Sequence, residues 1–327
     1  MVEVSVLVAV YNAEAYLRTC LDSLLGQTLS QVQVVCIDDC STDGSPQLLD
    51  DYAQRDQRLE VVHLARNLGP SGARNQGLAR VKGRYVCMVD ADDWLSADAL
   101  EKAAEVLDAH ELTDCVLFQL EQWAADGSVE RIAMPDFTAL TGELAFRLSL
   151  DWQIHGLYMT RTDLQRQYPY DDQCGLYGDE NTTRIHYLVS REVRQCSGVY
   201  YYRQHPASTT RQVSFRQFDK LSGHESLHRQ LASLGASQPL LDEVENLRWL
   251  GLIDVCKFWH LSARRLTLQE RRQGLAGMRH AWASIDRRAL KKETTAHFGY
   301  RPCRWWWLFR LQEGVYFTLR GFLGRNG

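Results

Sequence analysis

The chain has 327 residues, of which 45% are hydrophobic and 24% charged, and its formal net charge is −4. This composition is typical of a globular protein, and it excludes a disordered chain and a protein that coats nucleic acid with positive charge. The charge is uneven, because residues 257–327 hold 15 Lys and Arg against 4 Asp and Glu, while residues 1–256 hold 22 against 37. The sequence therefore combines an acidic body with a basic C-terminal region.

Cellular location is indicated by what the sequence lacks. No apolar run approaches the roughly 20 residues of a membrane-spanning helix, and the apolar N-terminus has neither the basic segment nor the cleavage site of a signal peptide. The nine cysteines include no C-x-x-C pair. We therefore expect a cytoplasmic protein with reduced thiols and no structural zinc.

The first hundred residues alternate between short β-branched runs, which predict buried strands, and segments with apolar residues at helical spacing. Ser45 is the expected N-cap of the second helix, with Pro46 as its first residue. This order predicts a parallel, doubly wound sheet, whose ligands bind at the carboxyl ends of the strands. The expected strands are 4–10, 33–37, 59–63 and 85–89, and the expected helices are 13–25, 47–55 and 72–80.

The rest of the chain is less regular. Residues 214–292 have a helical pattern throughout, and we find no internal repeat. Between the two regions we expect helices at 97–110, 141–150 and 181–189, a strand at 114–122 and an edge strand at 198–203.

Polar residues follow three of the predicted strands. Tyr11 and Asn12 come after the first strand, Asp39 after the second, and Asp90 and Asp92 after the fourth. Asp-x-Asp at a strand end directs two carboxylates to one side of the pleat. Carboxylates that converge there need a cation such as Mg²⁺ or Mn²⁺, which is usually shared with substrate phosphates.

An alternative interpretation treats the acidic run as a turn in which Asp93 caps a helix that begins at Trp94. The sequence has no G-x-G-x-x-G after a strand and no G-x-x-x-x-G-K-[ST]. This absence argues against a dinucleotide-dependent dehydrogenase and a P-loop nucleotidase.

Several motifs, in order, resemble those of the family-2 nucleotide-sugar glycosyltransferases. The resemblance covers residues 1–215. The motifs are VLVAVYN at 6–12, IDDCSTDGS at 37–45, NLGPSGARNQGL at 67–78, VDADDWL at 89–95, GDE at 178–180 and YYRQHPASTT at 201–210.

This resemblance implies an α/β fold of the GT-A type, in which a mostly parallel doubly wound sheet is flanked by helices. It implies a catalytic domain over 1–215, with a nucleotide-sugar half at about 1–110 and an acceptor half at about 111–215. Residues 216–327 would form a helical, basic C-terminal extension. The family also implies an inverting mechanism.

Carried over position by position, the resemblance implies that Tyr11 stacks on the nucleobase and Asp39 hydrogen-bonds it. Uracil is the commonest base in the family, so a UDP-sugar is favoured. Arg74 would lie beside the diphosphate or the sugar, Asp90 would face ribose or sugar, and Asp92 would bind the metal. The nucleotide-sugar site would also include Ala9, Asn12 and Asn67.

Asp179 occupies the position of the catalytic base, and Glu180 is the alternative if the loop is shifted by one residue. Asp179 could equally begin a helix. His205 is a candidate second metal ligand, or a histidine that stabilises a turn or faces the acceptor. The candidate contacts to diphosphate or acceptor are Asp93, Trp94, Arg203 and Arg211.

We therefore predict a metal-dependent, inverting glycosyltransferase of polysaccharide biosynthesis that uses a UDP-sugar and a glycan or lipid-linked acceptor. The alternatives are a sugar-nucleotidyltransferase and an inactive glycan-binding relative. The former usually has a Gly-rich loop after the first strand, where this chain has Tyr11 and Asn12.

The C-terminal segment 301–327 combines Trp and Arg with an apolar stripe at helical spacing. Such a pattern is typical of a helix at a membrane interface. We expect it to dock on the anionic inner face of the membrane, or alternatively to pack on the catalytic domain or on another copy in a homo-oligomer.

Overall fold

The computed structural model describes residues 2–205, 214–296 and 303–323. The chain divides into two compact units. The first unit comprises Met1–Asp172 and Gly178–Arg211, and the second comprises Gln173–Tyr177 and Gln212–Gly327. A short piece of the chain thus belongs to the second unit although both its neighbours in sequence belong to the first.

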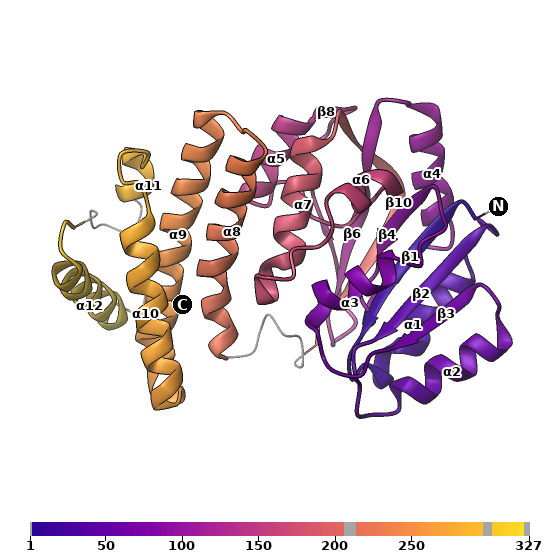
Figure 1. Cartoon of the computed structure of the whole chain (residues 1–327), viewed down its shortest axis with the longest axis horizontal. Coiled ribbons are helices and arrows are strands. Elements are labelled where there is room, and N and C mark those ends of the chain that lie inside the picture. The colour runs from indigo at the N-terminus through magenta and orange to yellow at the C-terminus, as the bar shows by residue number, and fades with distance from the viewer. Residues whose placement is uncertain (1, 206–213, 297–302, 324–327) are drawn as a thin grey trace. The chain divides into compact units, whose positions relative to one another are not determined.

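The first unit is an α/β domain built on a ten-stranded sheet (Figure 1). Its strands are β1 Val4–Val10, β2 Val32–Asp38, β3 Leu59–His63, β4 Tyr85–Met88, β5 Trp94–Leu95, β6 Thr113–Trp123, β7 Val129–Ile132, β8 Leu140–Thr141, β9 Tyr158–Arg161 and β10 Glu192–Arg203. Its helices are α1 Glu14–Leu25, α2 Ser45–Arg55, α3 Gly69–Leu78, α4 Ala99–Ala109, α5 Gly142–Leu150, α6 Thr162–Gln167 and α7 Gly178–Val189.

The sheet has the order β3-β2-β1-β4-β9-β6-β10-β5. Strands β3, β2, β1 and β4 are parallel, as predicted. Beyond β4 the sheet is mixed, because β9 runs antiparallel to both β4 and β6, and β10 is parallel to β6. The predicted α/β fold, a sheet flanked by helices, is confirmed. Its parallel half is formed by β1 to β4, which come from the alternating strands and helices of the first hundred residues.

Both faces of the parallel half are covered, which explains the continuous apolar runs of its strands. The even-numbered valines of β1, such as Val6 and Val8, pack in one core with α1, α2 and α4. Leu7 and the Ile37 side chain of β2 pack on the opposite face against α3.

Three local predictions are wrong. Helix α2 begins at Ser45 with Gly44 as its N-cap, because the Ser45 hydroxyl instead accepts the backbone N–H of Ala13 at 3.0 Å. Residues 198–203 do not form an edge strand, since they end the longer β10, which lies between β6 and β5. Trp94 begins strand β5, so Asp93 does not cap a helix.

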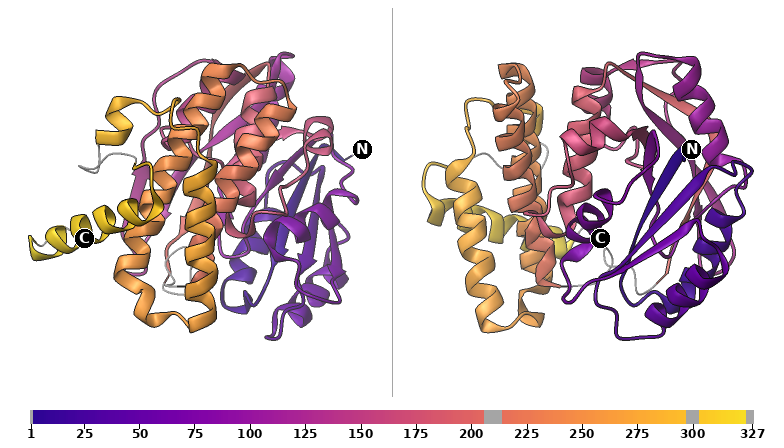
Figure 2. Two further views of the ribbon diagram at one scale, coloured as in Figure 1. Left: turned by 60° about the vertical axis from the view of Figure 1, so that its left-hand side comes forward. Right: turned by 45° about the vertical axis from the view of Figure 1, so that its right-hand side comes forward.

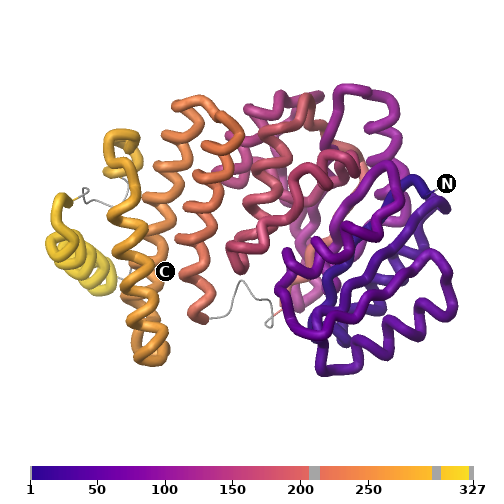
Figure 3. Tube along the Cα trace, viewed as in Figure 1, coloured from indigo at the N-terminus to yellow at the C-terminus, as the bar shows by residue number. Residues whose placement is uncertain are grey.

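The second unit is helical, as the periodicity of 214–292 predicted. Helices α8, α9 and α10 pack side by side (Figures 1 and 2) and enclose their own core around Trp249, Leu252 and Phe309. The Cα trace of Figure 3 follows these helices in chain order. The unit contains η1 Gly175–Tyr177, η3 Phe215–Phe218, α8 Asp219–Ser233, α9 Gln238–Ser262, η4 Ala263–Arg265, α10 Leu268–Ser284, α11 Lys292–Ala296 and α12 Trp306–Phe322. Among the described residues, no helix has the length and apolar character to cross a membrane.

Candidate active site

The polar residues that the sequence placed at strand ends do lie at one edge of the sheet. Strands β2, β1 and β4 are neighbours, and their carboxyl ends lead into the loops that begin at Asp39, Tyr11 and Val89. Asp38 pairs with Val10 at the last position of the parallel register. The ladder between these strands therefore brings segments far apart in sequence to the same place.

Asn12 ties the loops after β1 and β2 together. Its backbone has a left-handed φ of 51°, its side-chain oxygen accepts the N–H of Thr42 at 2.7 Å, and its own N–H donates to Ser41 Oγ at 3.0 Å. Tyr11 beside it is 53% exposed, and Ala9 is partly buried at the end of β1. An exposed aromatic ring thus stands on a fixed loop.

Asp39 is almost fully buried, and its backbone N–H donates to the carbonyl of Val10 at 2.8 Å. Its carboxylate accepts the N–H of Leu68 at 2.6 Å, and its carbonyl accepts the side-chain amide of Asn67 at 3.2 Å. Burial raises the pKa of Asp39, while the N–H groups of Leu68 and Gly69 oppose this shift by favouring the charged form. The predicted residues Asp39 and Asn67 therefore share one corner with Tyr11 and Asn12.

Arg74 connects the acidic strand end with the start of α7. Its Nη2 donates to Asp90 Oδ1 at 2.5 Å, and its Nη1 lies 3.7 Å from Asp179 Oδ2. Arg74 can reach both because α3 lies close to the sheet at Gly77, where a Cβ would come within 2.4 Å of Ile37 Cδ1. Three predicted site residues, 105 positions apart at the extremes, therefore form one charged group.

The guanidinium of Arg74 is buried but not saturated. Among the described residues, its Nε and Nη1 find no hydrogen-bond acceptor, and its side chain is only 3% exposed. Burial by itself lowers the pKa of Arg74, but the carboxylates of Asp90 and Asp179 outweigh it and raise the pKa above the usual range. A cation with spare, buried N–H groups is suited to an anionic ligand.

Two carboxyl groups after β4, those of Asp93 and Asp90, have raised pKa values. Burial raises the pKa of Asp93 to about 9, and the neighbouring Asp90 and Asp92 add to the shift. The pKa of Asp90 is also raised by burial, with Arg74 acting in the opposite direction. Asp93 is 1% exposed and accepts hydrogen bonds from Tyr200 Oη at 2.9 Å and from the N–H of Arg203 at 2.7 Å. Its carboxyl therefore holds β10 against the strand end.

Asp92 faces His205. Its Oδ2 lies 2.8 Å from His205 Nε2, and its carbonyl accepts Arg203 Nε at 2.9 Å. The guanidinium of Arg203 lies over the rings of Trp94, at 4.5 Å from the ring centre, and Tyr16, at 5.4 Å. The described residues contain no group of three or more His, Cys, Asp or Glu that could hold a metal ion.

Asp179 and Glu180 differ in their surroundings although they are adjacent in the first turn of α7. Asp179 is partly exposed, and its Oδ1 accepts the N–H of Glu180 at 2.8 Å. Glu180 points away toward the buried Arg184, whose Nη1 lies 2.5 Å from Glu180 Oε1. The structure thus places Asp179, not Glu180, next to Arg74.

These contacts gather the predicted site residues into groups at the carboxyl ends of the strands: the corner with Asp39 and Asn67, the group around Arg74, and the contacts of Asp92 and Asp93 with the end of β10. Trp94 stacks on Tyr201 and touches the site through Arg203, and Arg211 lies outside the described residues. Sequence reasoning missed Tyr200 and Tyr170, whose ring lies 5.5 Å from the Arg74 guanidinium. Neither follows a predicted strand of the parallel half, so no local signal marked them.

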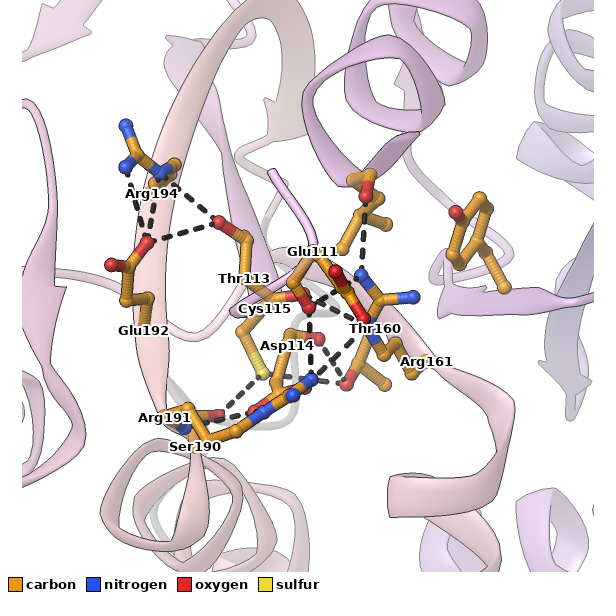
Figure 4. A network of polar contacts seen from close by, with 12 residues as sticks. Glu111, Thr113, Asp114, Cys115, Thr160, Arg161, Ser190, Arg191, Glu192 and Arg194 are labelled. Atoms are coloured by element: carbon orange, nitrogen blue, oxygen red, sulfur yellow. Dashed lines mark hydrogen bonds and ion pairs between the residues drawn. The ribbon is translucent and has the colours of Figure 1, made fainter. Parts of the chain in front are cut away.

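A second polar cluster lies at the opposite ends of β6 and β10 (Figure 4). Asp114 accepts hydrogen bonds from the N–H and Nε of Arg191 at 2.8 and 3.0 Å. Arg161 donates to the carbonyls of Thr113 and Leu107. This cluster joins the first residues of the two parallel strands to β9.

Comparison with known proteins relates this chain to glycosyltransferases. Residues 5–156 match the model of glycosyl transferase family 2. Over 114 residues, the chain is 40% identical to the putative glycosyltransferase EpsH of Bacillus subtilis, with 35% of this chain and 32% of EpsH covered. Over 155 residues, it is 33% identical to the poly(ribitol-phosphate) β-N-acetylglucosaminyltransferase TarS of Staphylococcus aureus, with 46% of this chain and 27% of TarS covered. The aligned part thus spans about a third or less of these relatives.

Two solved structures share the fold. TarS residues 1–349, in complex with UDP-GlcNAc, superpose with a TM-score of 0.72 at 20% identity over 99% of this chain and 92% of that chain. The mannosyltransferase PcManGT of Pyrobaculum calidifontis, in complex with GDP-Man and Mn²⁺, superposes with a TM-score of 0.53 at 17% identity over 98% of this chain and 87% of that one. This likeness confirms the predicted GT-A type of fold, including the helical C-terminal part.

Proposed function

We propose that this chain, whose residues 5–156 match glycosyl transferase family 2, moves a sugar with inversion from a UDP-sugar to a hydroxyl of a glycan or lipid-linked acceptor in polysaccharide biosynthesis. One observation carries the proposal: the unsaturated guanidinium of Arg74 joins Asp90 of the Asp-x-Asp segment to Asp179. This arrangement combines a site for a leaving diphosphate with a carboxylate beside it.

A nucleotide donor is supported by the corner formed by Tyr11, Asn12, Asp39 and Asn67. An exposed ring on a fixed loop offers a stacking surface, and the adjacent carboxyl and amide offer hydrogen-bond partners to a base edge. TarS, whose fold this chain shares, was solved with UDP and with UDP-GlcNAc. UDP-GlcNAc is therefore the first donor to test.

Asp179 is the proposed base, because it is accessible while Glu180 is engaged by Arg184. Its carboxylate would take the proton of the acceptor hydroxyl as the oxygen attacks the anomeric carbon from the face opposite the diphosphate. Arg74 would donate N–H groups to the diphosphate or sugar, where negative charge grows as the bond breaks. One base and a single displacement produce inversion.

Asp92 and His205 are the proposed ligands of Mn²⁺ or Mg²⁺, since Asp92 Oδ2 and His205 Nε2 already lie within 2.8 Å. The buried Nδ1 of His205 has no hydrogen-bond partner among the described residues. Such a cation takes its remaining ligands from substrate phosphates and water, and would offset the charge on the leaving diphosphate. Arg203, Trp94, Arg211 and Asp93 remain predicted contacts or supports around it.

The test is a donor-hydrolysis screen across UDP- and GDP-sugars with Mn²⁺, Mg²⁺ or EDTA, followed by variants in the best donor. We expect Asp179→Ala to lower nucleotide release by at least about 100-fold, and Glu180→Gln, the matched control, to retain more of the activity. A wild-type rate in Asp179→Ala would refute the assignment of the base. Pyrophosphate release from nucleoside triphosphate and sugar phosphate would instead indicate a nucleotidyltransferase, and glycan binding without turnover an inactive relative.

We further propose that α12 docks on an anionic membrane surface. Phe309, Glu313 and Phe317 bury one face of this helix in the second unit. The other face is apolar and more than half exposed, with Leu311, Val315, Leu319 and Phe322 at helical spacing beside the exposed Trp307. Exposed Arg304 precedes the helix and complements lipid phosphate.

Co-sedimentation with phosphatidylglycerol vesicles tests this docking. Leu311→Glu with Leu319→Glu should remove binding, while Leu268→Glu, at a comparably exposed leucine in α10, should weaken it only slightly. Equal sedimentation of all variants would refute membrane docking. A loss of dimer in light scattering, without an effect on vesicle binding, would instead assign the face to contacts between copies.

A further inference from the structure

The five residues that precede the proposed base have an unexpected place in the fold. Gln173–Tyr177 belong to the helical second unit, whereas the chain returns to the first unit at Gly178, one residue before Asp179. The segment contains the short helix η1 Gly175–Tyr177. The segment that leads to the proposed base therefore packs with residues from the C-terminal part of the chain.

Asp219, the first residue of α8, holds the start of η1. Its Oδ2 accepts the backbone N–H of Leu176 at 3.3 Å. Gly175 has a left-handed φ of 55°, and a Cβ at this position would lie 2.1 Å from Asp219 Oδ2. The turn thus needs both the conformation and the small size of glycine, and the Asp219 carboxyl fills the space that a side chain would take.

The end of η1 is held by the next turn of α8. The ring of Tyr177 meets His224 edge to face at 6.2 Å between ring centres. A Cβ on Gly223 would lie 2.7 Å from Tyr177 Cβ, so the helix backbone is in direct contact with this residue. Helix α8 therefore contacts η1 at its first and at its last residue.

The backbone at Gly178, directly after η1, is closely packed. A Cβ on Gly178 would lie 2.0 Å from the carbonyl oxygen of Asp171 and 2.3 Å from Ser71 Oγ, so the backbone is enclosed there too. Consecutive Cα atoms are about 3.8 Å apart, and Asp179 comes only two residues after Tyr177. A shift of η1 would consequently reach the base carboxylate, which Arg74 contacts only through a 3.7 Å ion pair.

We propose that Asp219 is a positioning residue for the transfer reaction: it clamps η1 against α8 and so sets the position of the Asp179 carboxylate. This inference rests on the proposed role of Asp179. It assigns to the C-terminal helical unit a part in catalysis, although that unit contains none of the residues that would touch the donor.

An alternative is that Asp219 merely stabilises the fold. Burial raises the pKa of Asp219, so an ionised carboxyl at this position does not gain stability from its surroundings. What the turn requires of Asp219 is therefore a hydrogen-bond acceptor of the right size, and asparagine also provides one. Rescue by Asn therefore separates a clamp from a general need for negative charge.

The experiment measures kcat and KM for UDP-GlcNAc hydrolysis together with hydrogen exchange at the Leu176 amide. We expect Asp219→Ala to lower kcat about tenfold or more, as displaced catalytic groups do, to leave KM within about twofold, and to speed exchange at Leu176. Asp219→Asn should retain most of kcat. Gly175→Ala, which disturbs the clamp from the other side, should reproduce the Asp219→Ala result.

Asp254→Ala is the matched control. Asp254 also contacts α8, through an ion pair with Lys220 at 2.9 Å, but it does not bond to η1 in the described structure. Unchanged kcat in Asp219→Ala and Gly175→Ala despite faster exchange would overturn the inference and leave the proposed function intact. Equal loss in Asp219→Asn and Asp254→Ala, with lower thermal stability, would also overturn it. If the wild-type protein hydrolyses no nucleotide-sugar, the proposed function fails first, and this inference with it.

Discussion

The two polar clusters of the first unit lie at opposite ends of its strands. They contain the same residue types but differ in whether their buried polar atoms have hydrogen-bond partners. In the cluster around Asp114, Arg161 and Arg191 donate to carboxylates and backbone carbonyls (Figure 4). None of the residues labelled there has a buried polar side-chain atom without a partner, as far as the structure describes the chain. This is the condition of a network that stabilises a fold.

The cluster around Arg74 is different. Two buried nitrogens of Arg74 make no hydrogen bond within the described residues, and Asp90, Asp92 and Asp93 crowd one strand end. Such groups cost folding free energy until a ligand satisfies them. The two clusters are therefore alike in their charged residue types, and the unsatisfied nitrogens of Arg74 distinguish the second from the first.

The largest expected effect is a difference in turnover between arginine variants of the two clusters. Arg74→Met removes the proposed hydrogen-bond donor to the diphosphate and should lower UDP-GlcNAc turnover about 100- to 1,000-fold. Arg191→Met, its counterpart in the Asp114 cluster, should leave turnover within about twofold, because that cluster lies at the opposite end of the strands. Nucleotide release measures both variants, and equal losses would remove the distinction between the clusters.

The next prediction concerns stability, and here the larger effect is expected in the Asp114 cluster. Asp114→Ala leaves the backbone N–H of Arg191 without its acceptor and should lower the free energy of unfolding by about 2 kcal/mol. Asp92→Ala should change it by about 0.5 kcal/mol or less while it abolishes metal-dependent binding of UDP. Urea unfolding and calorimetry with Mn²⁺ measure the two quantities. A larger loss of stability in Asp92→Ala would contradict the proposed division of roles.

A further effect concerns pH. The pKa of Asp93 is raised to about 9 by burial, so the folded state keeps a proton that the unfolded chain loses near pH 4. The folded state binds more protons between these values, and its stability from this group therefore falls as pH rises. Asp93→Asn cannot ionise, so its stability relative to wild type should increase by about 1.4 kcal/mol for each pH unit between pH 5 and pH 8.

A control for this pH effect lies in the second unit. Arg288 lowers the pKa of Asp286 to about 2, so Asp286 is ionised in both folded and unfolded chains above pH 5. Asp286→Asn should therefore show no slope between pH 5 and pH 8. A flat profile for Asp93→Asn as well would mean that the crowded strand end does not hold a proton.

Much of the first unit was predictable from the sequence because its signals are local. The β-branched runs and the helices between them predicted the parallel half, and Asp90, Asp92 and Arg74 stood in recognisable motifs. The predictions failed for features that depend on residues close in space but distant in sequence. Residues 198–203 read as an edge strand, because a short sequence does not show that β5 pairs on the outer side of β10. Ser45 read as an N-cap, but its hydroxyl bonds to Ala13.

The sequence by itself determined the α/β class, the edge of the sheet that carries the polar residues, and the chemistry of those residues, since hydrophobic period and motif spacing are properties of neighbouring positions. Only the tertiary structure decided which carboxylate faces Arg74 and which faces Arg184, because that choice depends on the packing of α3 and α7. It also decided that Asp219 of the second unit contacts the segment before Asp179, although Asp219 precedes the basic region 257–327 of a chain with net charge −4. The physical reason is the same in both cases: contacts between distant positions depend on packing, and no local pattern records them.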